Sequence, residues 1–213
     1  MKLMRNWGEK MLIDLSYEIY SGMPVYPGDI EVELENDKKV KNDGYANHNL
    51  KMGMHAGTHL DLPSHMLEDQ QRISDISLNY LSGQAKLFNA VGEKVITLKN
   101  ESRELIEKDD MVIINTGFAA KYGKKEYYRE HPVLSEELVE FFIQKEIKLL
   151  GFDMPSPDRS PFKIHHKLFN NNIFILENLC NLDKLSEVKT FKLIIFPLKV
   201  RAEAAPCRVA AEI

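Results

Sequence analysis

Three histidines and one aspartate lie within a short segment that reads HAGTHLDLPSH, from His55 to His65. His55, His59 and Asp61 offer two imidazoles and a carboxylate, a mixed donor set that suits Zn²⁺, Mn²⁺ or Fe²⁺. An ion held there with an open position would lower the pKa of a bound water from about 15.7 to about 7. His65 follows Asp61 closely enough to move protons beside that water as a general acid or base. The segment therefore predicts a metal site with hydrolytic chemistry.

The backbone of this segment must bend for the donors to converge. Gly57, the β-branched Thr58 and Pro63 argue against a helix. A straight strand from His55 to Asp61 would span about 20 Å, whereas ligand atoms lie roughly 2.0–2.2 Å from a metal. Gly57 and Pro63 permit a bulge or turn. We therefore expect a bent strand end that presents the donors inward; the alternative is a polar loop whose histidines only satisfy backbone groups.

The length and composition are those of a globular protein with one substantial core, or at most two small ones. Of the 213 residues, 44% are hydrophobic and 28% charged, and we expect a single domain over residues 1–213. The net charge of −4 argues against a nucleic-acid-binding surface, which is normally basic. No apolar run approaches the ~20 residues of a membrane span, and the charges in MKLMRNWGEK argue against a signal peptide. The two cysteines, Cys180 and Cys207, lie outside any CxxC motif and favour a reducing, cytoplasmic location.

Apolar runs predict more strands than helices. The predicted strands are residues 11–19, 30–35, 94–100, 111–118, 147–153, 173–179 and 190–200. The clearest helix spans residues 133–147, where Ser135 can cap the N-terminus and an apolar stripe follows at helical spacing. A shorter helix is predicted over residues 101–108. This pattern indicates an α/β or α+β domain with a mixed sheet.

The segment HAGTHLDLPSH also matches the pattern HxGTHxDxPxH, and through it the chain resembles the metal-dependent cyclase family, which includes bacterial kynurenine formamidases and isatin hydrolases. Companion motifs occur in the family's order: MPVYPGD, INTGF, YYREHPVLS, LLGFDMPSPD, HHKLFNNNIFILENLCNL and FPLKVRAEAAPCRVAA. The resemblance runs from about Leu12 to the C-terminus. It implies an α/β fold of the swivelling β/β/α type, in which a β-rich mixed sheet carries flanking helices. It also implies a homodimer or a higher homo-oligomer.

The resemblance assigns roles that the residues alone leave open. It implies a set of metal ligands: His55, His59, Asp61, His165 and Glu177. Asp61 would be able to bridge two ions, and His65 would be the catalytic acid and base. From the residues alone, His166 is an equal candidate beside His165, and Glu177 reads equally well as a surface charge. The cofactor would be a divalent transition metal, Zn²⁺ before Mn²⁺, with one or two ions per chain.

Tyr26, in the segment VYPGD, is the predicted substrate-binding residue. Kynurenine formamidases usually carry a tryptophan at this position, so Tyr26 departs from the pattern of that enzyme. The alternative is that Tyr26 packs a turn beside Pro27. Asp153, Ser156 and Asp158, in the segment GFDMPSPD, are interpreted mainly as a structural loop near the pocket.

The reaction expected from this resemblance is hydrolysis of a small-molecule amide. Metal-activated water would attack the carbonyl, and His65 would deliver the proton to the leaving nitrogen. The best single substrate is N-formyl-L-kynurenine, which would give L-kynurenine and formate in tryptophan catabolism. The alternatives are an isatin hydrolase-like enzyme for cyclic amides, a metal-dependent cyclase or dehydratase of the same family, and a non-catalytic metal-binding protein. A serine or cysteine hydrolase is disfavoured, because the chain has no GxSxG motif and no cysteine in a polar, activating context.

Overall fold

The computed structural model describes residues 10–68 and 71–213. Residues 1–9, which carry most of the charged segment that argues against a signal peptide, lie outside the described residues. The main sheet has eight strands. In spatial order they are β1 (Leu12–Asp14), β12 (Ala204–Glu212), β11 (Thr190–Pro197), β5 (Ser82–Asn89), β7 (Met111–Asn115), β9 (Leu149–Phe152), β10 (Phe174–Glu177) and β4 (His59–Asp61).

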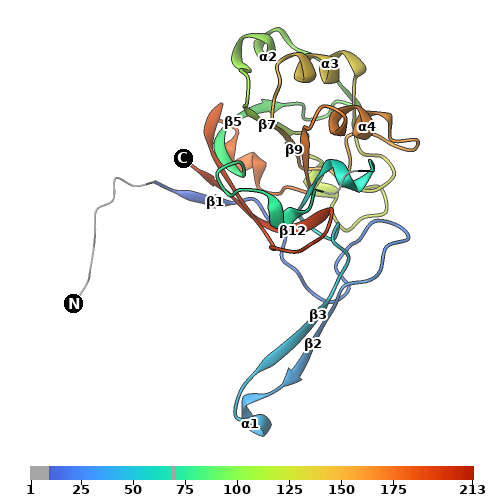
Figure 1. Ribbon diagram of the computed structural model, residues 1–213, viewed down its shortest axis with the longest axis vertical. Helices are drawn as coiled ribbons and strands as arrows, with labels where there is room; N and C mark the ends of the chain where they lie inside the picture. The colour runs from blue at the N-terminus through green and yellow to red at the C-terminus, as the bar shows by residue number, and fades with distance from the viewer. Residues whose placement is uncertain (1–9, 69–70) are drawn as a thin grey trace, which may run out of the picture.

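This sheet closes on itself. β4 pairs with β10 along one edge and with the first residues of β12 along the other, so the strands form a barrel-like core (Figure 1). The strands from β5 through β7 and β9 to β10 are parallel, and the remaining pairings are antiparallel. The predicted fold class, a β-rich mixed sheet of the swivelling β/β/α type with flanking helices, is confirmed.

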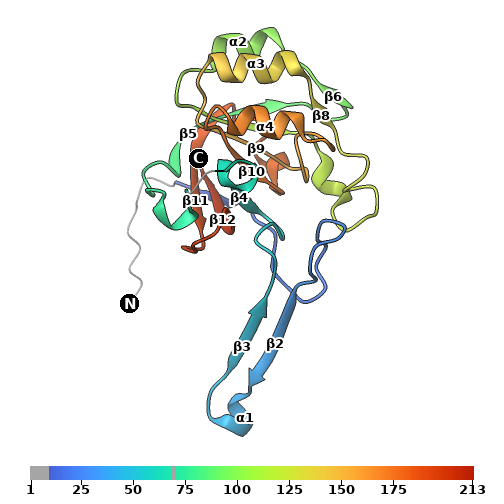
Figure 2. The same ribbon diagram turned by 45° about the vertical axis from the view of Figure 1, so that its right-hand side comes forward.

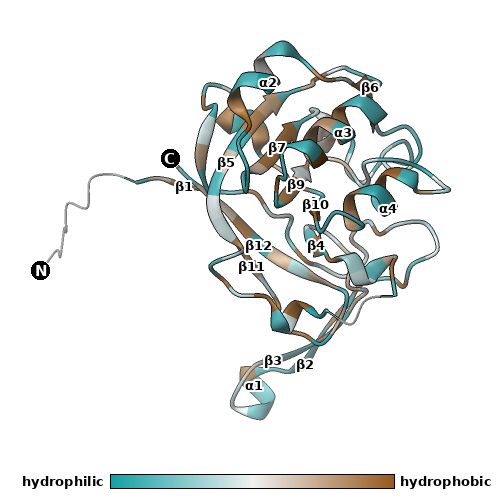
Figure 3. Cartoon of the chain, turned by 45° about the horizontal axis from the view of Figure 1, so that its top comes forward, coloured by the Kyte–Doolittle hydropathy of each residue, from teal (hydrophilic) through white to brown (hydrophobic). Residues whose placement is uncertain are grey.

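Two apolar cores lie on opposite faces of the central strands. Along β7, Met111 and Ile113 point into the barrel, whereas Val112 and Ile114 point outward. The outward residues pack against apolar side chains of the helices, including Phe142. Both faces are covered, so these strands consist of continuous apolar residues, as is typical of parallel sheets (Figure 3).

Three of the helices lie on the outer face of the sheet (Figure 2). They are α2 (Asn100–Leu105), α3 (Glu136–Gln144) and α4 (Lys163–Phe169). α3 confirms the predicted helix and its cap, since the Ser135 hydroxyl accepts a hydrogen bond of 3.2 Å from the Leu138 amide. It is shorter than the predicted span of 133–147, because Val133 and Leu134 form a strand instead. α4 was not predicted. Among the described residues, no helix is both long and apolar enough to cross a membrane.

Several predicted strands are shorter than their apolar runs. The run over residues 94–100 contains only β6 (Val95–Ile96), which pairs with β8 (Val133–Leu134) in a small sheet of its own. The prediction was too long because α2 already begins at Asn100. The run over residues 11–19 contributes only β1, since the chain then turns into the loop that precedes β2.

A two-stranded arm extends away from the barrel. It consists of β2 (Glu33–Lys38) and β3 (Asn47–Lys51), joined by the short helix α1 (Val40–Asp43), and Figures 1 and 2 show it reaching well beyond the body. Nearly all of its side chains are exposed, including the directly paired Leu34 and Leu50. The loop between β1 and this arm carries Tyr26 back to the body of the protein.

Candidate functional site

All the residues predicted for the site line one pocket of about 270 Å³ on the outer side of the barrel. They are Tyr26, His55, His59, Asp61, His65, His165 and Glu177. They come from separate parts of the chain: the loop before β2, the segment around β4, the helix α4 and the end of β10. The fold therefore brings the two halves of the predicted ligand set together.

The backbone around β4 has the predicted bend. Gly57 has a φ of +67°, a conformation in which side chains are strained, and a Cβ there would lie 3.0 Å from Met23 Cε. The strand proper begins two residues later, with His59 and Asp61 on one face and Leu60 pointing into the barrel core. The bent strand end expected from the sequence is confirmed.

β10 supplies the facing carboxylate. In the antiparallel pairing of the two strands, Glu177 lies directly opposite His59. Glu177 Oε2 lies 3.4 Å from His59 Nε2, and Asp61 Oδ1 lies 3.5 Å from the same nitrogen. His59 Nδ1 donates to the Gly57 carbonyl at 2.9 Å, which leaves Nε2 directed at the two carboxylates. The pairing of β4 with β10 thus builds the centre of the cluster.

His165 rather than its neighbour reaches this cluster. His165 is buried in α4 and its Nε2 lies 3.3 Å from Glu177 Oε1, whereas the next residue, His166, is exposed. Glu177 is buried and is not the surface charge that the sequence also allowed. The structure therefore places His165 and Glu177, rather than His166, beside the other predicted ligands.

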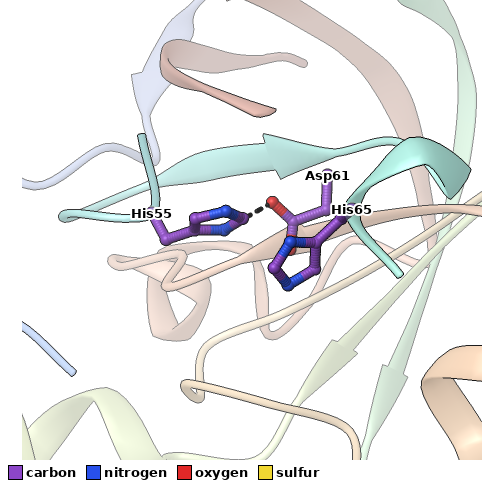
Figure 4. A group of neighbouring side chains, drawn as sticks. All are labelled: His55, Asp61 and His65. Atoms are coloured by element: carbon purple, nitrogen blue, oxygen red, sulfur yellow. Dashed lines mark ion pairs between the residues drawn. The ribbon is translucent and has the colours of Figure 1, made fainter. Parts of the chain in front are cut away.

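His55 and His65 are half-buried and complete the cluster beside Asp61 (Figure 4). His55 Nδ1 lies 3.0 Å from Asp61 Oδ1, and the rings of His55 and His65 are 4.2 Å apart between centroids. Potential donor atoms of His55, Asp61 and His65 lie within 4.8 Å of one another, as do those of His59, Asp61 and Glu177. Asp61 belongs to both groups, so it is placed where a carboxylate could bridge two ions.

The electrostatics of the cluster favour a cation. Burial opposes a charge on His59, but Asp61 and Glu177 outweigh it and raise the pKa of that imidazole well above its ordinary value. Burial likewise opposes a charge on Asp61, yet His59 and His55 hold the pKa of its carboxyl well below the usual range. By contrast, burial lowers the pKa of His65 in spite of Asp61, so this imidazole is neutral near pH 7.

The donor set fits a divalent metal. Three buried polar atoms make no hydrogen bond within residues 10–68 and 71–213, although each lies within ion-pair distance of another side chain of the cluster: His59 Nε2, Asp61 Oδ1 and Glu177 Oε1. Buried polar groups are almost always paired, so three orphaned atoms facing one point require an explanation. Imidazole nitrogens and carboxylate oxygens are ligands for Zn²⁺ and Mn²⁺. An ion among them would satisfy all three atoms.

Aromatic side chains form the far wall of the pocket. Tyr26 is 38% exposed and packs edge-on against Tyr128, with ring centroids 5.7 Å apart. Tyr128 and Phe162 also line the pocket, and neither was predicted from the sequence. The pair YY within YYREHPVLS was the available signal for Tyr128, but nothing in its spacing indicates a contact with Tyr26.

Comparison with known proteins places these features in one family. Residues 13–159 match the model of the Cyclase family, described as "Putative cyclase". A kynurenine formamidase from Bacillus cereus is 30% identical over 202 residues, which cover 92% of this chain and 94% of that protein. A kynurenine formamidase from Bacillus mycoides has the same identity and coverage.

Solved structures share the fold over nearly the whole chain. A "predicted metal-dependent hydrolase" from Bacillus stearothermophilus is 26% identical with a TM-score of 0.79, covering 96% of this chain and 98% of that one. Isatin hydrolase A from Labrenzia aggregata, at 22% identity, has a TM-score of 0.86 and covers 97% of this chain and 94% of that one. At this identity, the similarity to isatin hydrolase A shows a shared fold.

Proposed function

The chain belongs to the cyclase family, and from that premise we propose that it is a metal-dependent amidohydrolase that acts on N-aryl formamides. N-formyl-L-kynurenine is the preferred substrate, because the relatives of 30% identity are kynurenine formamidases. The reaction adds water across the formyl C–N bond and yields formate and an arylamine. The observation that carries the proposal is the set of orphaned buried atoms of His59, Asp61 and Glu177 beside His65.

In this proposal five residues would hold the metal: His55, His59, Asp61, His165 and Glu177. Zn²⁺ is the first choice for this donor set and Mn²⁺ the second. When bound, a divalent ion supplies Lewis acidity that activates water and polarises the amide carbonyl. Asp61, shared between the two groups of donors, allows either one or two ions per chain.

His65 performs the proton transfers. Its imidazole is neutral near pH 7 because burial lowers its pKa, so it can accept a proton from the attacking water. The protonated ring then donates this proton to the leaving nitrogen, which departs as a neutral amine. His65 lines the pocket beside His55, where a substrate held against the ligand cluster would lie within its reach. A general acid and base of this kind contributes about 10²–10⁴ to the rate.

A panel of amides tests the proposed activity. Purified protein is supplied with Zn²⁺ or with Mn²⁺ and assayed against N-formyl-L-kynurenine, formanilide and isatin. The proposal expects turnover of the two aryl formamides above that of isatin. Preferential ring opening of isatin would favour a cyclic-amide hydrolase, and absence of turnover for all three would contradict the proposed activity.

Tyr26 is proposed to contact the aryl group of the substrate. Replacing Tyr26 with alanine removes the aromatic face, and since an aromatic pair contributes about 0.5–1.5 kcal/mol, the KM for formanilide should rise about 2- to 13-fold. Tyr26→Phe retains the ring and should leave KM nearly unchanged. An N-alkyl formamide, which has no aryl group, serves as the control substrate. An equal rise in KM for both substrates would contradict the assignment of Tyr26.

We also propose that the chain acts as a homodimer in the cytoplasm, with the arm of β2 and β3 packed against a second copy. An isolated two-stranded sheet is at best marginally stable in water. Two leucines that pair across this arm, Leu34 and Leu50, are 36% and 46% exposed. A partner surface would cover these leucines and the open strand edges. The arm also joins directly to the loop that carries Tyr26.

Substitution of the leucine pair tests this assembly. The double variant Leu34→Lys with Leu50→Glu keeps a favourable cross-strand pair but removes the apolar contact, and it should convert the dimer to a monomer by light scattering after size-exclusion chromatography. Leu78→Lys, at a leucine that is 58% exposed on the body, is the matched control and should remain dimeric. A monomeric wild-type protein at micromolar concentration would contradict the proposal.

A further inference from the structure

We propose that Asp158 is the positioning residue for the metal ligand His165, whose ring orientation and tautomer it sets. The proposal rests on the metal centre proposed above and adds a residue that the sequence assigned to a structural loop. A histidine ligand needs its second ring nitrogen held by an acceptor, so that the coordinating nitrogen keeps its lone pair and direction.

The contacts of Asp158 meet this requirement. Its Oδ1 lies 2.6 Å from His165 Nδ1, and both side chains are buried. A carboxylate at this distance accepts the Nδ1 proton, so Nε2 is the ring nitrogen that remains for an ion, which would displace any proton there. That Nε2 points to Glu177 Oε1 at 3.3 Å, on the ligand side of the pocket. The geometry thus assigns one nitrogen of His165 to Asp158 and the other to the ion.

The second oxygen of Asp158 fixes the helix that carries His165. Asp158 Oδ2 accepts hydrogen bonds from the backbone amides of Ile164, at 2.6 Å, and His165, at 3.4 Å. These amides belong to the first turn of α4, where backbone donors have no partner within the helix. Phe162, which precedes the helix, provides no side-chain cap. One carboxylate therefore holds both the backbone and the ring of the same ligand.

The loop that contains Asp158 is itself tied down. The Ser156 hydroxyl donates to the Asp158 carbonyl at 2.7 Å and accepts a hydrogen bond from the Asp158 amide at 3.4 Å. Asp158 is 6% exposed, so its carboxylate has little freedom to exchange these partners for water. An asparagine in its place has only one acceptor oxygen, and it cannot serve both the ring and the helix amides.

The test is the metal affinity of Asp158→Asn, measured by competition with a chromogenic chelator for Zn²⁺ in the full chain. We expect the affinity to fall about 10- to 100-fold, as for other partners of histidine ligands. Asp153→Asn is the matched control: this carboxylate is 1% exposed and lies on the same segment, but it binds Thr116 Oγ1 at 2.6 Å rather than a histidine. Asp153→Asn should lose stability without losing metal affinity.

The tautomer of His165 provides a second measurement that needs no variant. In the Zn²⁺-loaded protein labelled with ¹⁵N, long-range ¹H–¹⁵N correlation spectra should show a proton on Nδ1 of His165. A proton on Nε2, or an Asp158→Asn protein that binds Zn²⁺ as tightly as the wild type, would overturn the role of Asp158. A wild-type protein that binds no Zn²⁺ would instead overturn the proposed metal centre, so the two failures are distinguishable.

Discussion

Replacing His59 by alanine is expected to remove both the metal and the catalytic activity. His59 is buried between Asp61 and Glu177, and its Nε2 is one of the three orphaned atoms at the centre of the cluster. Without this imidazole the ion would lose a central ligand. The carboxylates of Asp61 and Glu177 would also lose the imidazole that lies between them. Metal content by plasma mass spectrometry, on protein purified without chelators, should fall from about one or two ions per chain to background.

His166→Ala is the matched control for this substitution. His166 is adjacent to the proposed ligand His165 but is exposed on α4, so its removal should change neither metal content nor turnover. Circular dichroism of both variants establishes that they are folded. A His59→Ala protein that is folded and retains both its metal and its activity would contradict the assignment of the cluster.

Replacing His65 by alanine is expected to separate catalysis from metal binding. The turnover number should fall about 10²- to 10⁴-fold, because the proton relay to the leaving nitrogen is lost. The metal content should remain that of the wild type, since the proposed ligands are intact. KM should change little. Steady-state kinetics with formanilide and metal analysis of the same sample check both parts of the prediction.

The geometry makes this experiment informative, because His65 also lies close enough to Asp61 and His55 to ligate an ion. Loss of metal from His65→Ala would assign His65 to the ligands and require another proton carrier. Met66→Leu is the control: Met66 is the next residue, also lines the pocket and is replaced at nearly constant volume. Its turnover should stay close to that of the wild type.

The local part of the site could be predicted from the sequence because it depends on neighbouring residues. The donors of HAGTHLDLPSH lie close together in the chain, and Gly57 and Pro63 indicate the bend that the structure contains. His165 and Glu177 could be assigned only by resemblance. Their positions depend on the antiparallel pairing of β10 with β4, which joins distant parts of the chain and leaves no periodic signal in either.

An element could be predicted where its own residues carry its cap and its apolar pattern. It could not be predicted where its stabilising contacts come from residues far away in the sequence. α3 has its own cap, Ser135, and a stripe of apolar residues. α4 was missed because it is short and its capping group is Asp158, which belongs to the preceding loop. The arm was only partly predicted, since β3 reads NHNLK and lacks the apolar alternation of a packed strand. Closure of the barrel through β4 and β12 likewise arises from pairing between segments far apart in sequence.

Hydrolysis of an amide in this pocket is expected to require a bound metal. The most direct measurement is turnover of N-formyl-L-kynurenine in ¹⁸O-labelled water, by protein stripped with a chelator and by the same protein resupplied with Zn²⁺ or Mn²⁺. We expect no turnover by the stripped protein, restored turnover with metal, and one labelled oxygen in the released formate. Full activity of the folded, metal-free protein, or a product without the label, would contradict this expectation.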